Sequence, residues 1–174
     1  WGGISVKDSG SLTAKNCVLR HGGNNLSVTG MATVENCILE GARDYGIYTT
    51  QSTAGTDIRN CTVVGGKNGI RVNNAGAGAL QVAGTEIREC SDAGLYIASL
   101  GSGVFGVAGN EISQCGTYPV YMNLGGLVSG FELGMVNSNQ FRGNTIINRV
   151  ALGGTVATDV TIPAGSYACA CTRA

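Results

Sequence analysis

Residues 56–63, TDIRNCTV, contain the pattern that decides the fold. Two short β-forming segments flank Asn60, and the apolar residues Ile58 and Cys61 lie three positions apart. In a flat strand the side chains alternate with a period of two, so residues three apart point to opposite faces. Asparagine tolerates the left-handed backbone conformation and therefore suits a one-residue bend. The pattern predicts two strands joined at Asn60, with Ile58 and Cys61 both facing inward.

The same pattern recurs along the chain. In five units a cysteine follows Asn, Glu or Gln and comes three residues after an apolar side chain: Cys17, Cys37, Cys61, Cys90 and Cys115. The steps between these cysteines are 20, 24, 29 and 25 residues, and a sixth unit has Asn144 where the cysteine would stand. A period of this length, with short strands and no helical pattern, is typical of a β-solenoid.

A short apolar segment recurs out of phase with the cysteines. It follows Gly in most units and is found at Gly3-Ile4, Asn25-Leu26, Gly46-Ile47, Gly69-Ile70, Gly94-Leu95, Pro119-Val120 and, more weakly, Val150-Ala151-Leu152. Each coil is therefore predicted to contain three strands. We expect one all-β domain over residues 1–174, with six to seven coils over about 1–154 and closing strands over 155–174. The 29 glycines disfavour long helices, so no substantial helix is expected.

These units resemble the right-handed parallel β-helix of the pectin-lyase-like superfamily, whose coils end in an Asn-Cys or Asn-x-Ile step. The opening residues 1–4, WGGI, resemble an internal coil, and the segment from 141–144, FRGN, to 165–167, GSY, resembles the last coil of bacterial secreted β-helix proteins. The resemblance implies a fragment or module of an extracellular or cell-envelope protein. It does not specify an activity, because the superfamily includes lyases, hydrolases, epimerases, tailspikes and adhesins.

The composition excludes several classes of partner. The 11 basic and 11 acidic side chains cancel, which argues against nucleic-acid binding. No apolar run approaches the roughly 20 residues that cross a bilayer, so no membrane insertion is expected. The chain starts at Trp1 without Met and has no recognisable signal peptide, which indicates processing or excision from a longer protein.

The cysteines are predicted to serve the core. Equivalent residues of stacked coils lie about 4.8 Å apart, so the five repeated cysteines are expected to form one inward column of small, reduced side chains: Cys17, Cys37, Cys61, Cys90 and Cys115. Their parallel Cβ vectors fit the disulfide dihedral poorly, and a linear stack does not converge on a metal ion, so no metal site is predicted. Cys169 and Cys171 share a face, and either cap the core or are reactive thiols near the chain end.

Aromatic side chains gather on the outward face of the first strands. The outward column reads Ser5, Ser27, Tyr48, Arg71, Tyr96, Tyr121 and Ala151. Tyr45 and Tyr118 lead into two of these strands. Tyrosine suits the faces and hydroxyls of sugars, and the resemblance implies a substrate groove along this strand. The candidate glycan face is therefore Tyr45, Tyr48, Arg71, Tyr96, Tyr118 and Tyr121. The alternative is that tyrosine is a good β-former whose rings stack on one another.

Acidic residues are the other candidates for chemistry. Counted from the cysteines, Asp57, Glu86 and Glu111 form a stripe beside a basic stripe, which would allow a Ca²⁺ site or the paired acids of a glycoside hydrolase. A solvated, charge-compensated face is the alternative that the adjacent arginines favour. Near the tyrosines, Lys67 separates Asp44 from Asp92 by one coil on each side. No catalytic residue is therefore predicted, and Ca²⁺ is the one cofactor considered.

These patterns favour a non-catalytic extracellular β-helix scaffold with a structural, adhesive or glycan-binding role. A polysaccharide lyase, hydrolase or epimerase acting in the same groove is the second hypothesis. An ice-binding or self-assembling surface is the third, but the Thr array that Thr13 and Thr33 begin is ended by Asp57. The expected partners are a polysaccharide and further copies of the chain, because both ends of a solenoid expose strand edges.

Overall fold

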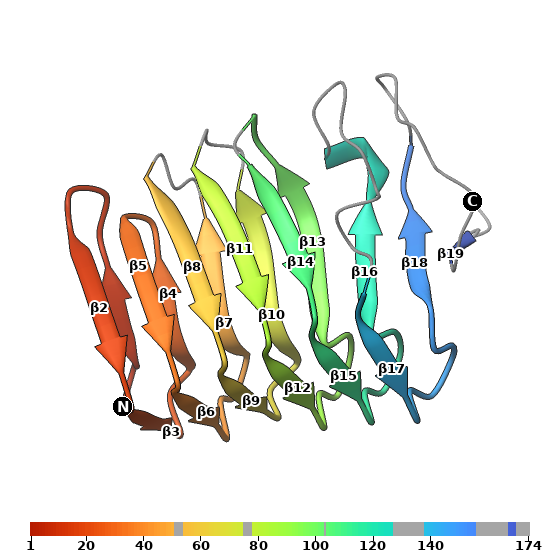
Figure 1. The fold of residues 1–174 in the computed structure, drawn as a ribbon, viewed down its shortest axis with the longest axis horizontal. Coiled ribbons are helices and arrows are strands. Elements are labelled where there is room, and N and C mark those ends of the chain that lie inside the picture. Colours follow the sequence, from red (N-terminus) through yellow and green to blue (C-terminus); the bar gives the residue numbers. More distant parts are fainter. Residues whose placement is uncertain (51–53, 75–77, 103, 127–137, 156–166, 170–174) are drawn as a thin grey trace.

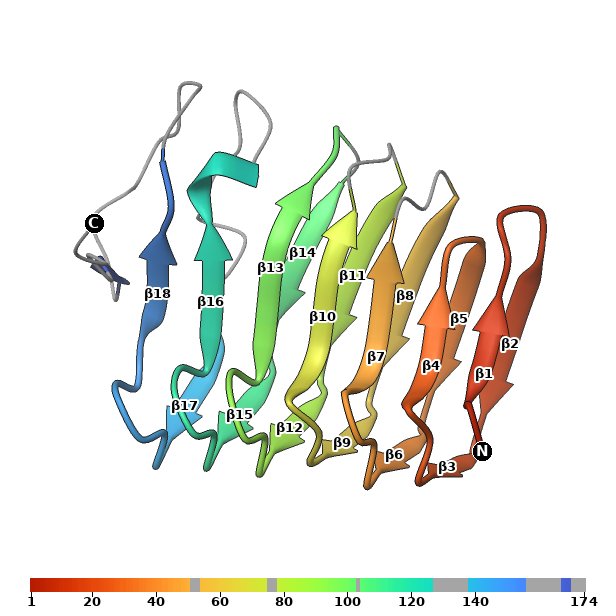
Figure 2. The ribbon, with the colours of Figure 1, turned by 180° about the vertical axis from the view of Figure 1, so that it is seen from behind.

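The chain winds into a solenoid of three parallel sheets, which Figures 1 and 2 show from opposite sides. The computed structural model describes residues 1–174 except 51–53, 75–77, 103, 127–137, 156–166 and 170–174. Every strand pair that it describes is parallel. The expected all-β fold is confirmed, and five coils contribute a described strand to each of the three sheets. Within the described ranges, the one helical segment is a short 3-10 turn, η1 (Leu124–Gly126).

Each sheet collects one strand from successive coils. Sheet A contains β1 (Ile4–Val6), β4 (Asn24–Val28), β7 (Tyr45–Thr50), β10 (Asn68–Asn74), β13 (Leu95–Leu100), β16 (Val120–Asn123), β18 (Val150–Gly153) and β19 (Tyr167–Cys169). Sheet B contains β2 (Ser11–Lys15), β5 (Met31–Glu35), β8 (Gly55–Arg59), β11 (Ala79–Ala83) and β14 (Phe105–Ala108). Sheet C contains β3 (Val18–Arg20), β6 (Ile38–Glu40), β9 (Thr62–Val64), β12 (Glu86–Arg88), β15 (Glu111–Ser113) and β17 (Gln140–Arg142).

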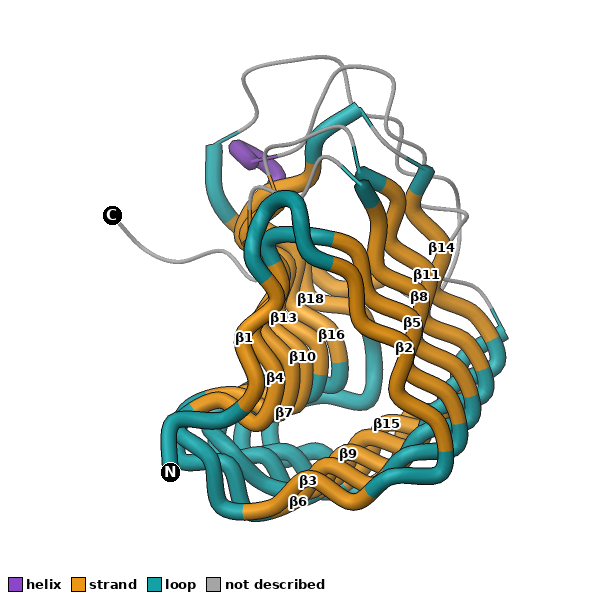
Figure 3. Tube along the Cα trace, turned by 90° about the vertical axis from the view of Figure 1, so that its left-hand side faces the viewer, coloured by secondary structure: helices purple, strands orange, loops and turns teal. Residues whose placement is uncertain are grey.

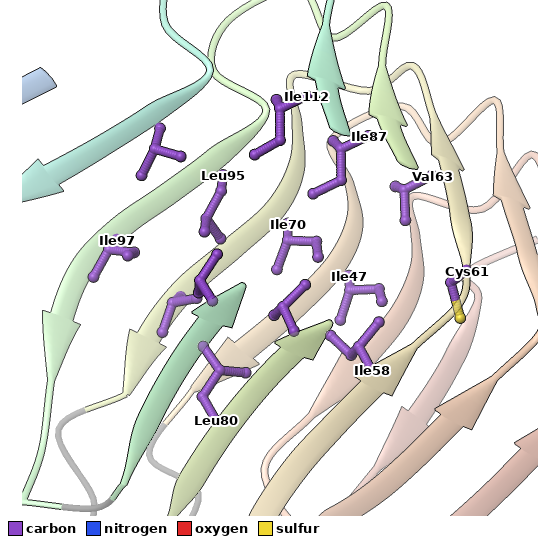
Figure 4. Close-up of a cluster of buried hydrophobic side chains, with 14 of the residues drawn as sticks. Ile47, Ile58, Cys61, Val63, Ile70, Leu80, Ile87, Leu95, Ile97 and Ile112 are labelled. Carbon is purple, nitrogen blue, oxygen red and sulfur yellow. The ribbon is translucent and has the colours of Figure 1, made fainter. Parts of the chain in front are cut away.

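The three sheets surround a common interior, as the view along the axis shows (Figure 3). One cluster of buried hydrophobic side chains fills this interior. Side chains at the same position of successive coils stack into columns, and Figure 4 shows part of them. In sheet A the inward column consists of Ile4, Leu26, Ile47, Ile70, Leu95, Val120 and Val150. These are the apolar segments that recur in the sequence. Each fully buried aliphatic side chain stabilises the fold by about 1.5–3 kcal/mol.

Each coil turns at two corners that require left-handed backbone. The first corner, between sheets B and C, has positive φ at Asn16, Asn36, Asn60, Gly84, Gly109 and Ser138. The second corner, between sheets C and A, has positive φ at His21, Gly41, Gly65, Glu89, Gln114 and Gly143. The predicted one-residue bend at Asn60 is confirmed, with φ 51°. The other four residues that precede the repeated cysteines are also left-handed.

The prediction that the five repeated cysteines form one column is wrong. Cys17, Cys37 and Cys61 follow the first corner, whereas Cys90 and Cys115 follow the second. The strand register proves the change, because Ile87 pairs with Val63 in sheet C, and the sheet B partner of Ile58 is Val82. Both corners need a left-handed residue followed by a small inward side chain, so the same local sequence fits either one. Cys17 is moreover exposed, while the other four are buried.

The same register corrects the acidic stripe. Asp57 lies on sheet B, where it is the Cα partner of Thr33 and Gln81. Glu86 and Glu111 are partners of each other on sheet C. The three carboxylates therefore do not form one column, although the pair on sheet C remains adjacent.

In several coils, the side chain that follows a corner accepts a hydrogen bond from a backbone N–H of the preceding coil. The Cys17 N–H donates to Cys37 Sγ at 3.4 Å, and the Cys61 N–H donates to Thr85 Oγ1 at 3.3 Å. In the later coils Thr85 and Asn110 stand at the cysteine position of the first corner, and the Thr85 N–H donates to Asn110 Oδ1 at 2.9 Å. A buried N–H without an acceptor costs about 1–3 kcal/mol, so these side chains stabilise the stacking of coils.

Candidate functional site

The outward column of sheet A lies where the sequence places it. Ser5, Ser27, Tyr48, Arg71, Tyr96, Tyr121 and Ala151 are successive Cα partners from β1 to β18. Ala151 differs from the rest, because it is 1% exposed. The ring of Tyr121 extends over β18, where a Cβ added to Gly153 would overlap it. Tyr121 is therefore the last residue of this column that is open to solvent.

Five tyrosines and one arginine contact one another in an unbroken series. Tyr45 and Tyr48 have ring centroids 5.4 Å apart, and the Arg71 guanidinium lies 5.3 Å from the Tyr45 centroid and 4.5 Å from that of Tyr96. The series continues from Tyr96 to Tyr121 at 4.9 Å, with an interplanar angle of 23°.

Tyr118 completes the series, with its ring centroid 6.0 Å from that of Tyr121. We call this set the tyrosine ladder: Tyr45, Tyr48, Arg71, Tyr96, Tyr118 and Tyr121. The structure thus brings together all six residues of the candidate face. It also shows the stacking of rings on one another that the alternative interpretation expects.

Arg71 is the link between the two halves of the tyrosine ladder. Its guanidinium lies between the rings of Tyr45 and Tyr96, an arrangement in which a cation is attracted to the negative ring face. In the part of the chain that the structure describes, seven ion pairs are formed and none involves Arg71. Its guanidinium therefore contacts aromatic rings and no carboxylate among the described residues.

Tyr121 is the ladder residue with a perturbed acidity. Burial raises the pKa of its phenol above the ordinary value, and the neighbouring Tyr96 and Tyr118 raise this pKa further. The phenol therefore stays neutral and keeps its O–H donor over the whole physiological pH range.

A polar column runs beside the tyrosine ladder, in the loops that lead from sheet C to sheet A. The Lys67 N–H donates to the carbonyl of Asp44 at 2.7 Å, and the Asp92 N–H donates to the carbonyl of Lys67 at 2.8 Å. Lys67 therefore separates the two acids by one coil on each side, as the sequence predicts. The order of side chains along this column is acid, base, acid.

Both acids of the polar column already have partners. The Asp92 carboxylate accepts hydrogen bonds from Thr117 Oγ1 at 2.9 Å and Asn68 Nδ2 at 3.3 Å. Asp44 pairs with Arg43 at 2.8 Å. Across the described ranges, no group of three or more His, Cys, Asp and Glu side chains is arranged to hold a metal ion. The column offers polar contacts at the edge of the ladder without a cluster of free carboxylates.

Two residues missed at the sequence level extend the face. Asn73 Nδ2 donates to Tyr48 Oη at 3.5 Å, and Ser99 Oγ donates to Asn73 Oδ1 at 3.0 Å. They meet because the pairing of β10 with β13 shifts register between Val72 and Asn73. A register shift leaves no periodic signal, so the sequence pattern does not reveal this contact.

The carboxylates of the other two sheets are paired with basic side chains. Asp57 pairs with Arg59 at 2.8 Å, Glu86 with Arg88 at 3.0 Å, and Glu111 lies 3.9 Å from Arg142. Glu86 and Glu111 also line a hollow of about 320 Å³ at the first corner, together with Gly84, Thr85, Gly109, Asn110, Ser138 and Gln140. The pairing is what a solvated, charge-compensated face requires.

Three parallel sheets with stacked inward columns define a parallel β-helix. The chain matches the family model described as the right handed beta helix region over residues 25–162, and it belongs to that family. No curated protein and no solved structure matches the chain significantly. None of the described segments is a helix long and apolar enough to cross a membrane.

Proposed function

We propose that the protein is a non-catalytic module that binds glycans through the tyrosine ladder, in an extracellular or cell-envelope setting. The observation that carries the proposal is the unbroken contact from Tyr48 to Tyr118 across β7, β10, β13 and β16. The ladder lies on the outer face of sheet A, and all five of its tyrosines are partly exposed.

The mode of contact follows from the stacking. Neighbouring rings and the Arg71 guanidinium cover one another's faces, so a ligand meets ring edges, phenolic hydroxyls and the guanidinium rather than a flat ring face. From β7 to β16 this row extends over three coil repeats, or about 14 Å. An extended chain with regularly spaced hydroxyl groups, lying along the solenoid axis, matches such a row of donors and acceptors.

The absence of catalysis in this proposal rests on the polar column. Acid–base catalysis needs carboxylates or bases that are free to exchange a proton within hydrogen-bond reach of the substrate. Asp92 accepts two hydrogen bonds, and Asp44 is held by Arg43. The nearest acids therefore already have polar partners, and two coils separate them.

Glycan-array binding of matched variants tests the proposal. Tyr96→Ala and Tyr121→Ala each break ladder contacts, and we expect binding to weaken more than tenfold. Tyr96→Phe and Tyr121→Phe keep the rings and remove one hydroxyl each, which should weaken binding by about 2- to 12-fold for a lost hydrogen bond. Met31→Ala, at a half-exposed position on sheet B, is the control and should leave binding unchanged.

The outcomes separate the hypotheses. If no glycan binds the wild-type protein, the ladder is not a glycan face. Unchanged binding of Tyr96→Ala would place the contact surface elsewhere on the solenoid. Shortening of a polysaccharide during incubation, followed by size-exclusion chromatography, would instead make the protein an enzyme and contradict the non-catalytic proposal.

A further inference from the structure

Three thiols stack at the first corner, and none of them belongs to the tyrosine ladder. Cys17, Cys37 and Cys61 lie on consecutive coils, each directly after a left-handed residue. All three are free thiols. Cys37 and Cys61 are 1% and 2% exposed, whereas Cys17 is open to solvent. The stack therefore has one accessible end and continues into the core.

The sulfur atoms of this stack repeat with the geometry of the coils. Cys37 Sγ lies 3.5 Å from the Ala14 carbonyl of the preceding coil, and Cys61 Sγ lies 3.5 Å from the equivalent Val34 carbonyl. Each sulfur also contacts the carbonyl two residues before its own cysteine, at 3.1 Å for Cys17 and 3.2 Å for the other two. Because the orientation recurs, successive sulfurs are separated by the coil repeat of about 4.8 Å.

This separation is informative about chemistry. A disulfide needs sulfurs about 2.05 Å apart, so this arrangement does not favour direct bonding. A metal–thiolate bond is about 2.3 Å long, so two of them in a straight line span about 4.6 Å. Three or more ligands must converge on one point, but a linear two-coordinate ion needs only two sulfurs on opposite sides. Soft monovalent ions such as Cu(I) prefer thiolates and accept this coordination.

We propose that Cys17 and Cys37 form a linear two-coordinate site for a soft monovalent metal ion, with Cys61 as the next rung of the stack. Binding exchanges the two S–H protons for two metal–sulfur bonds and releases both protons to solvent. The ion keeps its charge, so no oxidant or reductant takes part. The Cys17 N–H, which donates to Cys37 Sγ at 3.4 Å, stabilises negative charge on that sulfur.

The second corner provides an internal control. Cys90 and Cys115 are also one coil apart, but they are 2% and 0% exposed. Cys90 Sγ lies 3.7 Å from the carbonyl two residues earlier and 3.5 Å from the Gly65 carbonyl of the preceding coil, and Cys115 Sγ lies 3.4 Å from the carbonyl two residues earlier. The mutual hydrogen bond of these thiols, together with burial, raises the pKa of Cys90. Both thiols of this pair are buried, whereas Cys17 of the first corner is exposed.

Copper binding to the chain of residues 1–174 tests the site. The probe is Cu(I), titrated without oxygen against a coloured Cu(I) chelator, in a Cys169→Ser/Cys171→Ser background that removes the two C-terminal thiols. We expect one tightly bound Cu(I) per chain by native mass spectrometry, and two sulfur neighbours by X-ray absorption. Loss of a metal ligand should cost more than the 10- to 100-fold that supporting residues typically cost. Cys37→Ser and Cys17→Ser should therefore each weaken binding by at least about 100-fold.

Two matched variants keep the result interpretable. Cys17→Ser replaces an exposed side chain, so its effect is not a folding defect, and circular dichroism checks both variants. Cys115→Ser should change Cu(I) affinity less than threefold. Full affinity in Cys17→Ser, equal loss in Cys115→Ser, or three or more sulfur neighbours in the absorption spectrum would each overturn the proposal. None of these results bears on glycan binding, which is measured without metal.

Discussion

The backbone N–H of Cys115 donates to Oδ1 of Asn144, one coil further along the chain, at 3.0 Å. Asn144 is 7% exposed, and its Nδ2 also donates to the Ile112 carbonyl at 3.1 Å. One carboxamide therefore satisfies a buried donor and a buried acceptor at the second corner. Cys37 Sγ provides the same kind of acceptor at the first corner, where it accepts from the Cys17 N–H at 3.4 Å.

Replacing Asn144 tests this role. Asn144→Ala leaves the Cys115 N–H and the Ile112 carbonyl without partners, so the free energy of unfolding should fall by about 1–3 kcal/mol for each group. Asn144→Cys restores an acceptor sulfur and should lose less. Urea denaturation measures both, with Gln140→Ala on the exposed face of β17 as the control. Equal losses for the Ala and Cys variants would contradict the acceptor role.

Asn60 tests the requirement for left-handed backbone. Its φ is 51°, a region that costs most residues with a Cβ about 1–2 kcal/mol. Asn60→Val should lower the free energy of unfolding by at least that amount, because a β-branched side chain is least compatible with positive φ. Asn60→Gly should change stability by less than about 1 kcal/mol. A Val variant as stable as the Gly variant would show that the bend is not strained.

Ile70 tests the inward column of sheet A. The side chain is fully buried between Ile47 and Leu95, so Ile70→Ala leaves a cavity that its neighbours cannot close. The expected loss in the free energy of unfolding is about 2–5 kcal/mol. Ile38→Ala removes the same atoms at a position 39% exposed and should cost far less. Similar losses at both positions would mean that burial in the column is not what stabilises the coil.

Tyr121 gives the protein a predicted alkaline sensitivity. Burial and the neighbouring phenols raise its pKa in the folded state, so the folded chain holds this proton more tightly than the unfolded chain. The associated stability is fully present below the ordinary tyrosine pKa of 10.0 and is lost as the pH rises through the folded-state pKa. Unfolding measured from pH 8 to 11 should show a smaller alkaline loss for Tyr121→Phe than for wild type. Parallel curves would contradict this assignment.

The sequence predicts sheet A well because its signal is the same in every coil. An apolar residue such as Ile70 faces inward, and the next residue, such as Arg71, faces outward, so the column of tyrosines follows from counting. The cysteine column could not be predicted in the same way. Residues 87–90 and 58–61 share the order apolar, two polar residues, cysteine, yet they turn at different corners. The local requirement is identical, and only the pairing of neighbouring coils distinguishes them.

The side-chain contacts of the site were less accessible to prediction than its strand register. Counting places Tyr96 and Tyr121 in one column, but it does not reveal that their rings stack or that Arg71 lies between two rings. Those contacts depend on rotamers and on the loops that bring Tyr45 and Tyr118 beside the strands. The contact between Asn73 and Ser99 depends on a register shift, which the repeat pattern of the sequence does not predict.

The corner hydrogen bonds connect each coil to the coils on both sides of it. At both corners a backbone donor of one coil bonds a side-chain acceptor of the next, from Cys61 to Thr85 and from Cys115 to Asn144. Backbone bonds at the same corners run the other way, from the Thr62 N–H to the Cys37 carbonyl and from the Thr145 N–H to the Cys115 carbonyl, both at 2.9 Å. A defect at one corner is therefore shared by two coils, and stability belongs to neighbouring pairs of coils rather than to single ones.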